Sequence, residues 1–330
     1  MGLLSKDGFD WLAGKASYLF RDVDNLCKIE PETYGNVKSL SFLKLIALGY
    51  ILPMYTDIIG KQRDKGDYIK QMVYIDLFAG SGLNKVEHNE KSHFLLGSPF
   101  IAIHSTKKPF DKMIFVEEDK DLSNALKKRL SGKSKQQDFK WLANRYQCLT
   151  GDQNVIVRQI ISKLEPKTHC FIFLDPFSTE LNWLTLNYIS RNTRSDIFIN
   201  IMSTEIFRGI SSARKTGSLK LDSWFGNNSW TQIKNRTEIV SAYSKKVINL
   251  PDSGKAKREV FELLPINALE KLKREPYYYL LFAARKTKGG NRWIEAVRKV
   301  QDYLQDATDE DIKAILDKLF ESQSSLNDWY

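Results

Sequence analysis

The feature that most constrains the fold is an apolar, β-branched run that ends in an acid and turns through two glycines, Met72-Val73-Tyr74-Ile75-Asp76-Leu77-Phe78-Ala79-Gly80-Ser81-Gly82. Such a run is typical of a buried parallel strand. The glycines allow a tight turn and the close approach of a flat ligand. Ligands of open α/β sheets bind at the carboxyl edge, so the turn predicts a binding site there. A turn made only for folding would have the same pattern.

Three later apolar runs also end in acids, and helical patterns separate them. They span 112–117, 147–152 and 169–175, and they place Glu117, Asp152 and Asp175 at strand ends. Further strands are predicted over 196–201, 260–267 and 277–284. Strands that alternate with helices predict a doubly wound α/β fold with a mostly parallel sheet.

The glycine turn differs from a dinucleotide-binding turn, which carries a third glycine for phosphate contact in the spacing G-x-G-x-x-G. Here Asn84, Lys85 and Val86 follow Gly82 instead. Acids without a phosphate cradle suit a ligand with hydroxyls, an adenine and no pyrophosphate. S-adenosylmethionine fits that description.

The order of these motifs resembles the class I S-adenosylmethionine-dependent methyltransferases, through Asp76 to Gly82, Phe115-Val116-Glu117, Gly151-Asp152 and Leu174-Asp175-Pro176-Phe177. A closer resemblance, to the three-Cys-motif partner (TcmP) family, rests on Gly97-Ser98-Pro99, Asn182-Trp183, Trp224-Phe225-Gly226 and the run 278–283. It spans roughly residues 40 to 300. It implies a Rossmann-like sheet of seven strands with the last one antiparallel, S-adenosylmethionine as cofactor, and a partner protein that carries the three-Cys motif.

The resemblance and the residue types assign the cofactor to the strand ends. Glu117 can accept hydrogen bonds from both ribose hydroxyls, as an acid does in dinucleotide folds, with Asp119 in reserve. Asp152 can accept from the adenine amino group, and Asp76 would hold the methionine end or orient the glycine turn. Helix capping is the alternative for Asp119 and Asp152. The predicted cofactor site comprises Asp76, Phe78, Ala79, Gly80, Gly82, Glu117 and Asp152.

The run Asp175-Pro176-Phe177-Ser178 resembles the Asp-Pro-Pro-Tyr or Asp-Pro-Pro-Phe motif of methyltransferases that act on nucleobase amines. An exocyclic amine is a poor nucleophile because its lone pair is delocalised into the ring. Asp175 and the Pro176 carbonyl would accept the amine hydrogens, and Phe177 would stack on the base and fix its orientation. The chain has one proline where the motif has two, so the aromatic residue comes one position early. A strand-ending turn with a buried Phe is the alternative.

The charge and the cysteines bear on partners and compartment. A net charge of +10 favours a polyanionic partner, RNA or DNA. The candidate contacts form two clusters, each of which could also be a solvated surface: Arg208, Arg214, Lys215 and Lys220, then Arg285 and Arg292. Cys27, Cys148 and Cys170 show no pair spacing and no metal motif. We therefore expect core thiols, no metal site, and a cytoplasmic protein with neither signal peptide nor membrane span.

The chain divides into an N-terminal helical extension (1–70), a methyltransferase-like domain (71–304) and a C-terminal helix packed on it (305–330). The helical pattern over 37–59 is expected to kink or end at Pro53. The polar stretch 83–97 predicts a long loop at the ligand edge, either a lid or substrate loop or a plain surface insertion.

These patterns together predict S-adenosylmethionine-dependent methylation of nucleic acid, at an exocyclic base amine. Two alternatives stay open. One is a catalytically inactive methyltransferase-like partner subunit that binds nucleic acid or another protein. The other is a methyltransferase for a small molecule or a protein.

Overall fold

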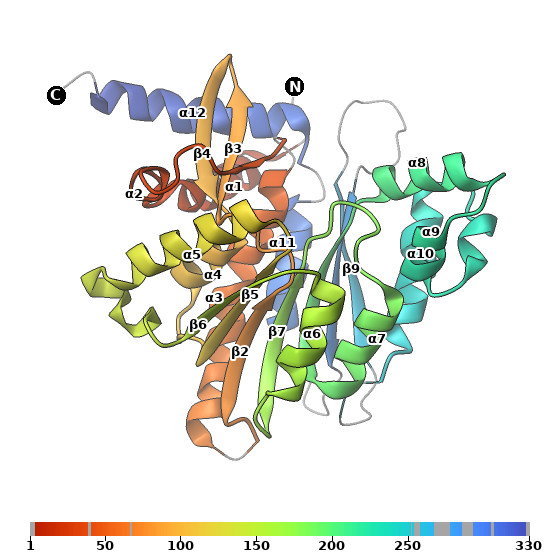
Figure 1. Ribbon diagram of the computed structural model, residues 1–330. Helices are drawn as coiled ribbons and strands as arrows, with labels where there is room; N and C mark the ends of the chain where they lie inside the picture. Colours follow the sequence, from red (N-terminus) through yellow and green to blue (C-terminus); the bar gives the residue numbers. More distant parts are fainter. Residues whose placement is uncertain are drawn as a thin grey trace.

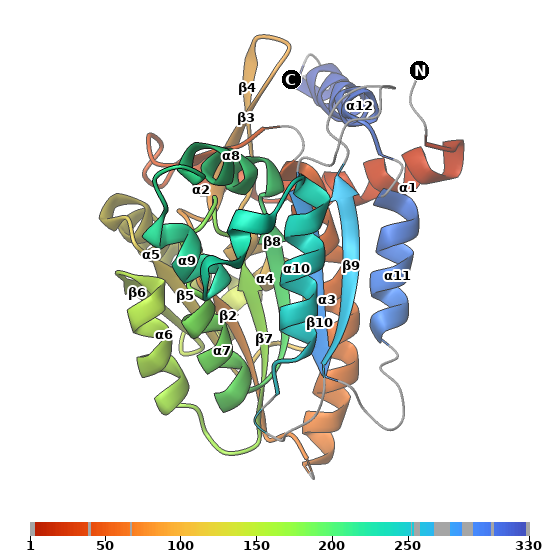
Figure 2. The same cartoon turned by 90° about the vertical axis from the view of Figure 1, so that its right-hand side faces the viewer.

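The structure is a computed structural model, and it describes residues 4–38, 41–66, 68–251, 253, 258–266, 278–285, 293–304 and 307–327. Within these ranges the strands form two sheets. The larger runs in the order β6-β5-β2-β7-β8-β10-β9, and the smaller in the order β1-β3-β4. Figure 1 shows the larger sheet between two layers of helices, and Figure 2 shows it from the side.

The larger sheet is mostly parallel. Its strands are β2 (Gln71–Asp76), β5 (Lys112–Glu117), β6 (Tyr146–Thr150), β7 (Thr168–Leu174), β8 (Arg194–Ile201), β9 (Arg258–Ile266) and β10 (Tyr278–Arg285). β2 pairs in parallel with β5 and β7, β5 with β6, and β7 with β8. β10 runs antiparallel to both β8 and β9. The predicted mixed α/β fold with a mostly parallel sheet is therefore confirmed.

Successive residues of β2 point to opposite faces of the sheet, as the pleat requires. Met72 and Tyr74 belong to one hydrophobic cluster, whereas Val73 and Ile75 belong to the other. Both faces are buried, so the strand sequences read as continuous apolar runs.

The helices divide between these two clusters. The first cluster receives side chains from α1 (Lys6–Ala16), the turn η1 (Ser17–Phe20), α2 (Val23–Cys27), α3 (Ser41–Lys65), α4 (Ser98–Ser105), α5 (Lys120–Ser134), the turn η2 (Gln137–Leu142), α11 (Trp293–Leu304) and α12 (Asp309–Asn327). The second receives them from α6 (Gln153–Ser162), α7 (Trp183–Asn192), α8 (Ser203–Ala213), α9 (Leu219–Phe225), the turn η3 (Asn228–Gln232) and α10 (Arg236–Ile248). Both ends of the chain thus share the first cluster with the sheet.

Helix α3 continues through Pro53, so of the kink or end predicted there, the end is wrong. Proline inside a helix costs about 3 kcal/mol, but the neighbouring Leu52 and Tyr55 are completely buried and hold the helix in place. Thr56 also donates a hydrogen bond to the Leu52 carbonyl at 2.8 Å. By length and composition α3 could cross a membrane, yet 61% of its most apolar window is buried inside the protein, as in the core helix of a soluble protein.

The predicted loop 83–97 is a β-hairpin, β3 (Leu83–His88) and β4 (Lys91–Leu96), and this corrects the sequence prediction. Asn89 and Glu90 form its two-residue turn with positive φ at both positions, the geometry that matches strand twist. β1 (Gly35–Asn36) adds a parallel strand beside β3. Figure 1 shows the hairpin rising above the larger sheet next to α12.

Helix α12 braces this hairpin. His88 Nε2 lies 2.7 Å from Asp317 Oδ1, and the ring of His93 stacks on Phe320 with centroids 3.4 Å apart. The start of α12 is fixed by a reciprocal cap: Asp311 N donates to Thr308 Oγ1 at 3.1 Å, and Thr308 N donates to Asp311 Oδ2 at 3.0 Å. This pair is a capping box in which Asp311 takes the place of the usual Glu.

The three cysteines are free thiols, as expected. Cys170 is fully buried, and Cys27 and Cys148 are half-buried against the first hydrophobic cluster.

The glycine turn gives a first prediction, because Gly82 has φ +77° and an added Cβ would lie 2.6 Å from Phe100 Cε2. Gly66 has the same φ with open space around it. We expect Gly66→Ala to lower the free energy of unfolding by about 1 kcal/mol through left-handed strain alone. Gly82→Ala should lower it by about 3 kcal/mol, since overpacking adds to the strain. Urea denaturation of both variants measures the difference, and equal losses would contradict the packing role of Gly82.

Candidate functional site

A cavity of about 940 Å³ lies at the carboxyl edge of the larger sheet. This volume falls in the range of small-molecule sites. Its wall comes from the ends of β2, β5, β7 and β8, from the start of α6, from residues 35–38, and from Ser41, Lys44 and Leu45 in the first turns of α3. Because the N-terminal segment forms part of the wall, the cavity is built from segments far apart in the sequence.

The glycine turn and Glu117, both of which the sequence assigns to the cofactor, form one part of this wall. Phe78, Ala79 and Gly80 line the cavity, and a Cβ at Gly80 would meet nothing within 4 Å. Glu117 Oε2 accepts a hydrogen bond from Gly80 N at 2.8 Å, and Oε1 accepts from Asp119 N at 2.9 Å. Burial raises the pKa of Glu117 although these backbone hydrogen bonds oppose the shift. Glu117 therefore fixes the glycine turn and faces the cavity at the same time.

Asp76 and Gly82 lie behind the turn and outside the cavity lining. Asp76 is fully buried, and its Oδ1 accepts a hydrogen bond from Phe78 N at 3.2 Å. Burial raises the pKa of Asp76 to about 7, and the nearby acids Asp175 and Glu117 add to the shift. Of the two roles expected for Asp76, this geometry fits orientation of the glycine turn.

Asp152 caps a helix, the alternative that the sequence left open. It is exposed, lies outside the cavity lining, and accepts a hydrogen bond from Asn154 N at 2.7 Å at the start of α6. The neighbouring Gln153 is buried and lines the cavity instead. Its position directly after the acid at a strand end is the sequence signal that could have identified it.

Asp175, Pro176, Phe177 and Ser178 all line the cavity where β7 ends. Phe177 is 81% exposed, so it is not the buried Phe of a purely structural turn. Lys44, which the sequence analysis missed, reaches both Asp175 oxygens, at 2.9 Å to Oδ1 and 2.7 Å to Oδ2. A lysine between apolar neighbours at the start of α3 was its only sequence signal.

Asn200, at the carboxyl end of β8, is a second residue missed from the sequence. It is 2% exposed, lines the cavity, and donates from Nδ2 to Asp175 Oδ1 at 2.7 Å. An amide inside the apolar run of β8 was the signal that could have identified it. Tyr278 on β10 lines the same part of the wall, and burial, together with the charge of Asp175, raises the pKa of its hydroxyl well above the usual value.

Acids predominate among the charged residues of the cavity wall. Among the described residues of the wall, the acids are Glu117, Glu118, Asp119, Asp175, Glu180 and Glu205, and the cations are Lys38 and Lys44. This balance favours a ligand with cationic centres and hydroxyls over one with phosphates. In the described parts of the chain, no group of three or more His, Cys, Asp or Glu side chains could hold a metal ion.

The predicted basic clusters are only partly gathered near the cavity. Arg208 on α8 is exposed and pairs with the lining residue Glu205 at 2.9 Å. Arg214 donates to the Ile233 carbonyl at 2.8 Å, which gives it a structural role. Lys215 and Lys220 are exposed.

The second basic cluster lies elsewhere. Because β10 is antiparallel to β8, its last residue, Arg285, lies at the amino edge of β8, where its backbone N donates to Asp196 Oδ1 at 3.1 Å. Arg285 is thus at the opposite edge of the sheet from the cavity. Arg292 lies outside the described residues.

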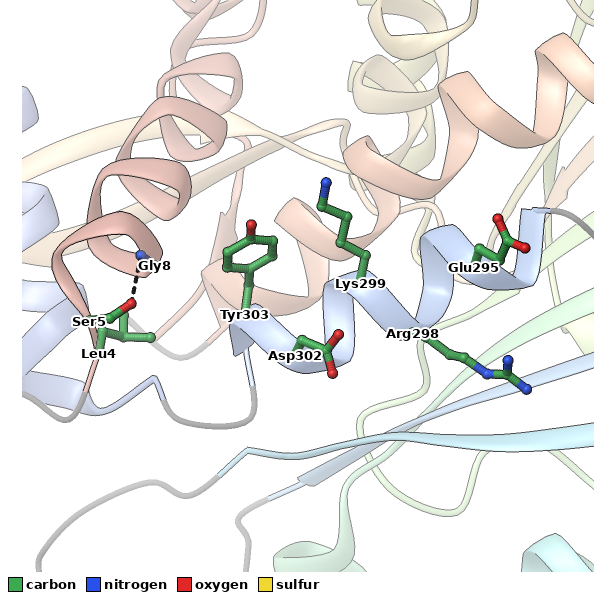
Figure 3. A pocket seen from close by; sticks show the side chains of 8 residues that line it. All are labelled: Leu4, Ser5, Gly8, Glu295, Arg298, Lys299, Asp302 and Tyr303. Atoms are coloured by element: carbon green, nitrogen blue, oxygen red, sulfur yellow. Dashed lines mark hydrogen bonds between the residues drawn. The ribbon is translucent and has the colours of Figure 1, made fainter.

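A second hollow of about 680 Å³ lies between the start of α1 and one side of α11. Its wall comprises Leu4, Ser5, Gly8, Glu295, Arg298, Lys299, Asp302 and Tyr303. Figure 3 shows Lys299 and Arg298 pointing in different directions, and Ser5 is engaged as the helix cap that accepts from Gly8 N. Polar groups that diverge do not form a binding constellation, so the cavity at the sheet edge is the candidate site.

Comparison with known proteins adds little. No family model matches the sequence, and no curated protein matches it. Among solved structures, the chain is similar to protein LPL1258 from Legionella pneumophila str. Philadelphia 1, of family DUF519. The two are 12% identical with a TM-score of 0.43, over 79% of this chain and 93% of that one.

The buried acid gives a second prediction. Between the unfolded pKa near 4 and the folded pKa of about 7, native Asp76 holds a proton that the unfolded chain has lost. Its contribution to stability is therefore fully present below that window and is lost as the pH rises through it. Relative to Asp76→Asn, the wild type should lose about 3 kcal/mol of unfolding free energy between pH 5 and pH 8. Urea titrations at both pH values test this, and parallel pH profiles would contradict the raised pKa.

Proposed function

We propose that this protein is an S-adenosylmethionine-dependent methyltransferase that acts on an exocyclic base amine of RNA or DNA. The observation that carries the proposal is one acid-lined cavity shared by two motifs. Glu117, which binds Gly80 of the glycine turn, ends β5, and the Asp175-Pro176-Phe177 run follows β7. These two strands lie on either side of β2, the strand that leads into the turn. A cofactor and a planar substrate could then meet across that turn.

The sheet order supports the same proposal. If the strands of the larger sheet are numbered from β2 along the chain, their order in the sheet is 3-2-1-4-5-7-6. Strand 7 of this numbering is β10, which runs antiparallel to its neighbours. This arrangement resembles the class I methyltransferase sheet, and a crevice beside its first strand is where such sheets bind ligands.

The charges of the cavity wall and the open space beside Gly80 both suit the cofactor. Glu117 would accept the ribose hydroxyls, Gln153 would lie next to the adenine, and the open side of Gly80 would admit the ligand to the backbone. The acids complement the positive charges of S-adenosylmethionine. When bound, the cofactor would supply an electrophilic methyl group.

The chain's own residues would position the acceptor. Asp175 would accept a hydrogen of the amine and direct its lone pair, and the exposed ring of Phe177 would stack on the base. The acid-lined wall disfavours phosphates, so the backbone of the nucleic acid would stay outside on the α8 surface while a single base enters. This requires an unpaired or flipped base.

Cofactor binding is the first test of this proposal. We expect S-adenosylhomocysteine to bind the isolated protein and raise its melting temperature by mass action. Glu117→Ala should weaken binding about tenfold or more, because charged hydrogen bonds to the ribose are lost. Glu165→Ala, an exposed acid near the start of β7 at the opposite edge, serves as the matched control. Calorimetry that finds no binding at millimolar ligand would favour the inactive partner subunit instead.

Nucleic-acid binding is tested by its salt dependence. Arg208, Lys215 and Lys220 changed together to Ala should lower the slope of log K against log salt by up to about 2 for a single strand, at about 0.7 per phosphate contact. The matched control changes Lys140, Lys163 and Lys245 to Ala, which removes the same charge from other exposed surfaces. Fluorescence anisotropy at several salt concentrations measures both slopes. Equal slopes in the two triple variants would exclude the α8–α9 surface.

A further inference from the structure

The hydrogen bonds around Asp175 restrict what its carboxylate can still accept. An ionised carboxylate offers about four lone-pair positions on two oxygens. Lys44 and Asn200 both donate to Oδ1, which fills the two positions of that oxygen. The Lys44 ammonium also lies 2.7 Å from Oδ2 as an ion pair and occupies one side of it, so one open position remains, on Oδ2. Because Asp175 lines the cavity, we take that position to face the ligand.

The orientation of the Asn200 amide is forced by this arrangement. A carboxylate can only accept, so Nδ2 must face Asp175. The consequence is that Asn200 Oδ1 is buried with no hydrogen-bond partner, a costly arrangement inside a strand. An apolar side chain would suit the run Ile199-Asn200-Ile201 better. The amide is explained by what it does for Asp175.

We propose that Asp175 presents one open acceptor position, on Oδ2, to an N–H group of the substrate, and that Lys44 and Asn200 are the positioning residues that set it. This inference rests on the proposed function, since it places the substrate amine at Asp175. It narrows the substrate to a group that still carries a hydrogen on nitrogen.

A single acceptor position has a consequence for the product. Transfer to a primary amine forms one N–CH₃ bond and breaks the S–CH₃ bond of the sulfonium donor, whose electron pair stays on sulfur. The nitrogen then loses one proton to water, and one N–H remains. The monomethylated base can therefore still donate to Asp175, whereas a dimethylated base cannot.

The test measures binding rather than turnover. Single-stranded oligonucleotides of one sequence carry a central adenine, cytosine or guanine, each as the free amine, the monomethyl amine and the dimethyl amine. For at least one base, the first two should bind within about threefold of each other and the dimethyl form about tenfold more weakly, the scale of one hydrogen bond to a charged group. Dimethyl forms that bind as well as the amines for all three bases would overturn the inference.

Variants separate positioning from a merely structural role. Lys44→Met and Asn200→Leu should each reduce the discrimination against the dimethyl form to about threefold or less, because the carboxylate is no longer held in one orientation. Lys44→Arg should retain it, since a guanidinium can bridge both oxygens. Tyr243→Phe is the control. It removes a hydroxyl that is buried without a hydrogen-bond partner, like Asn200 Oδ1, but lies away from the cavity, so the discrimination should stay unchanged.

The outcomes also distinguish this inference from the proposed function. Thermal melts confirm that each variant is folded, and a folded Lys44→Met or Asn200→Leu protein with full discrimination would overturn the positioning roles. If the wild type binds no S-adenosylhomocysteine but still binds the dimethyl form more weakly, the N–H acceptor site is supported and the methyltransferase function is refuted. If the wild type transfers methyl groups but binds all three forms equally, the function is supported and the N–H acceptor site is refuted.

Discussion

One buried guanidinium holds together the two parts of the chain that make the cavity. Arg129 on α5 has no exposed surface and donates to five carbonyls, those of Leu26, Ile29, Glu30, Thr33 and Ser81. Ser81 belongs to the glycine turn, and the other four carbonyls precede the segment that lines the cavity. A buried charge is tolerated only when its donors are satisfied, and burial lowers the pKa of Arg129 accordingly. The carbonyls thus stabilise the arginine, and the arginine fixes the turn against the N-terminal segment.

This clamp explains why the cavity needs both the sheet and the N-terminal region. β1 follows the clamped carbonyls and pairs with β3, which begins directly after Gly82. Gly97 closes the hairpin by donating to the Gly82 carbonyl at 2.8 Å. The glycine turn is consequently held by α5, by the hairpin and, through Gly80, by Glu117. A preorganised turn of this kind loses little freedom when a ligand binds.

The sequence predicts those parts of the site that depend on local order along the chain. The ends of β2, β5 and β7 are marked by an apolar run followed by an acid, so Glu117 and Asp175 could be placed at the sheet edge. Lys44 could not be placed there, since its contact with Asp175 spans 131 residues. Asp152 caps α6, and the sequence leaves this role open beside adenine binding because capping and ligand binding favour the same residue type at a strand end. The sequence predicts a loop where the hairpin lies because the hairpin turn, Asn89-Glu90, lacks the glycine that usually marks one.

If the protein binds a nucleic acid as proposed, the opposite charges of the whole chain and of its cavity would divide recognition between two regions. The chain carries a net charge of +10, yet six acids and two lysines are the charged residues among the described part of the cavity wall. The positive net charge would attract a polyanion at long range, where salt screens the attraction. The acids act at short range, and they would repel any phosphate that approached the cavity, since little water lies between the like charges. A neutral base meets no such repulsion. A nucleic acid drawn to this protein would therefore be bound outside by its phosphates and inside by one base, and the edge of that base that carries N–H groups would meet Asp175.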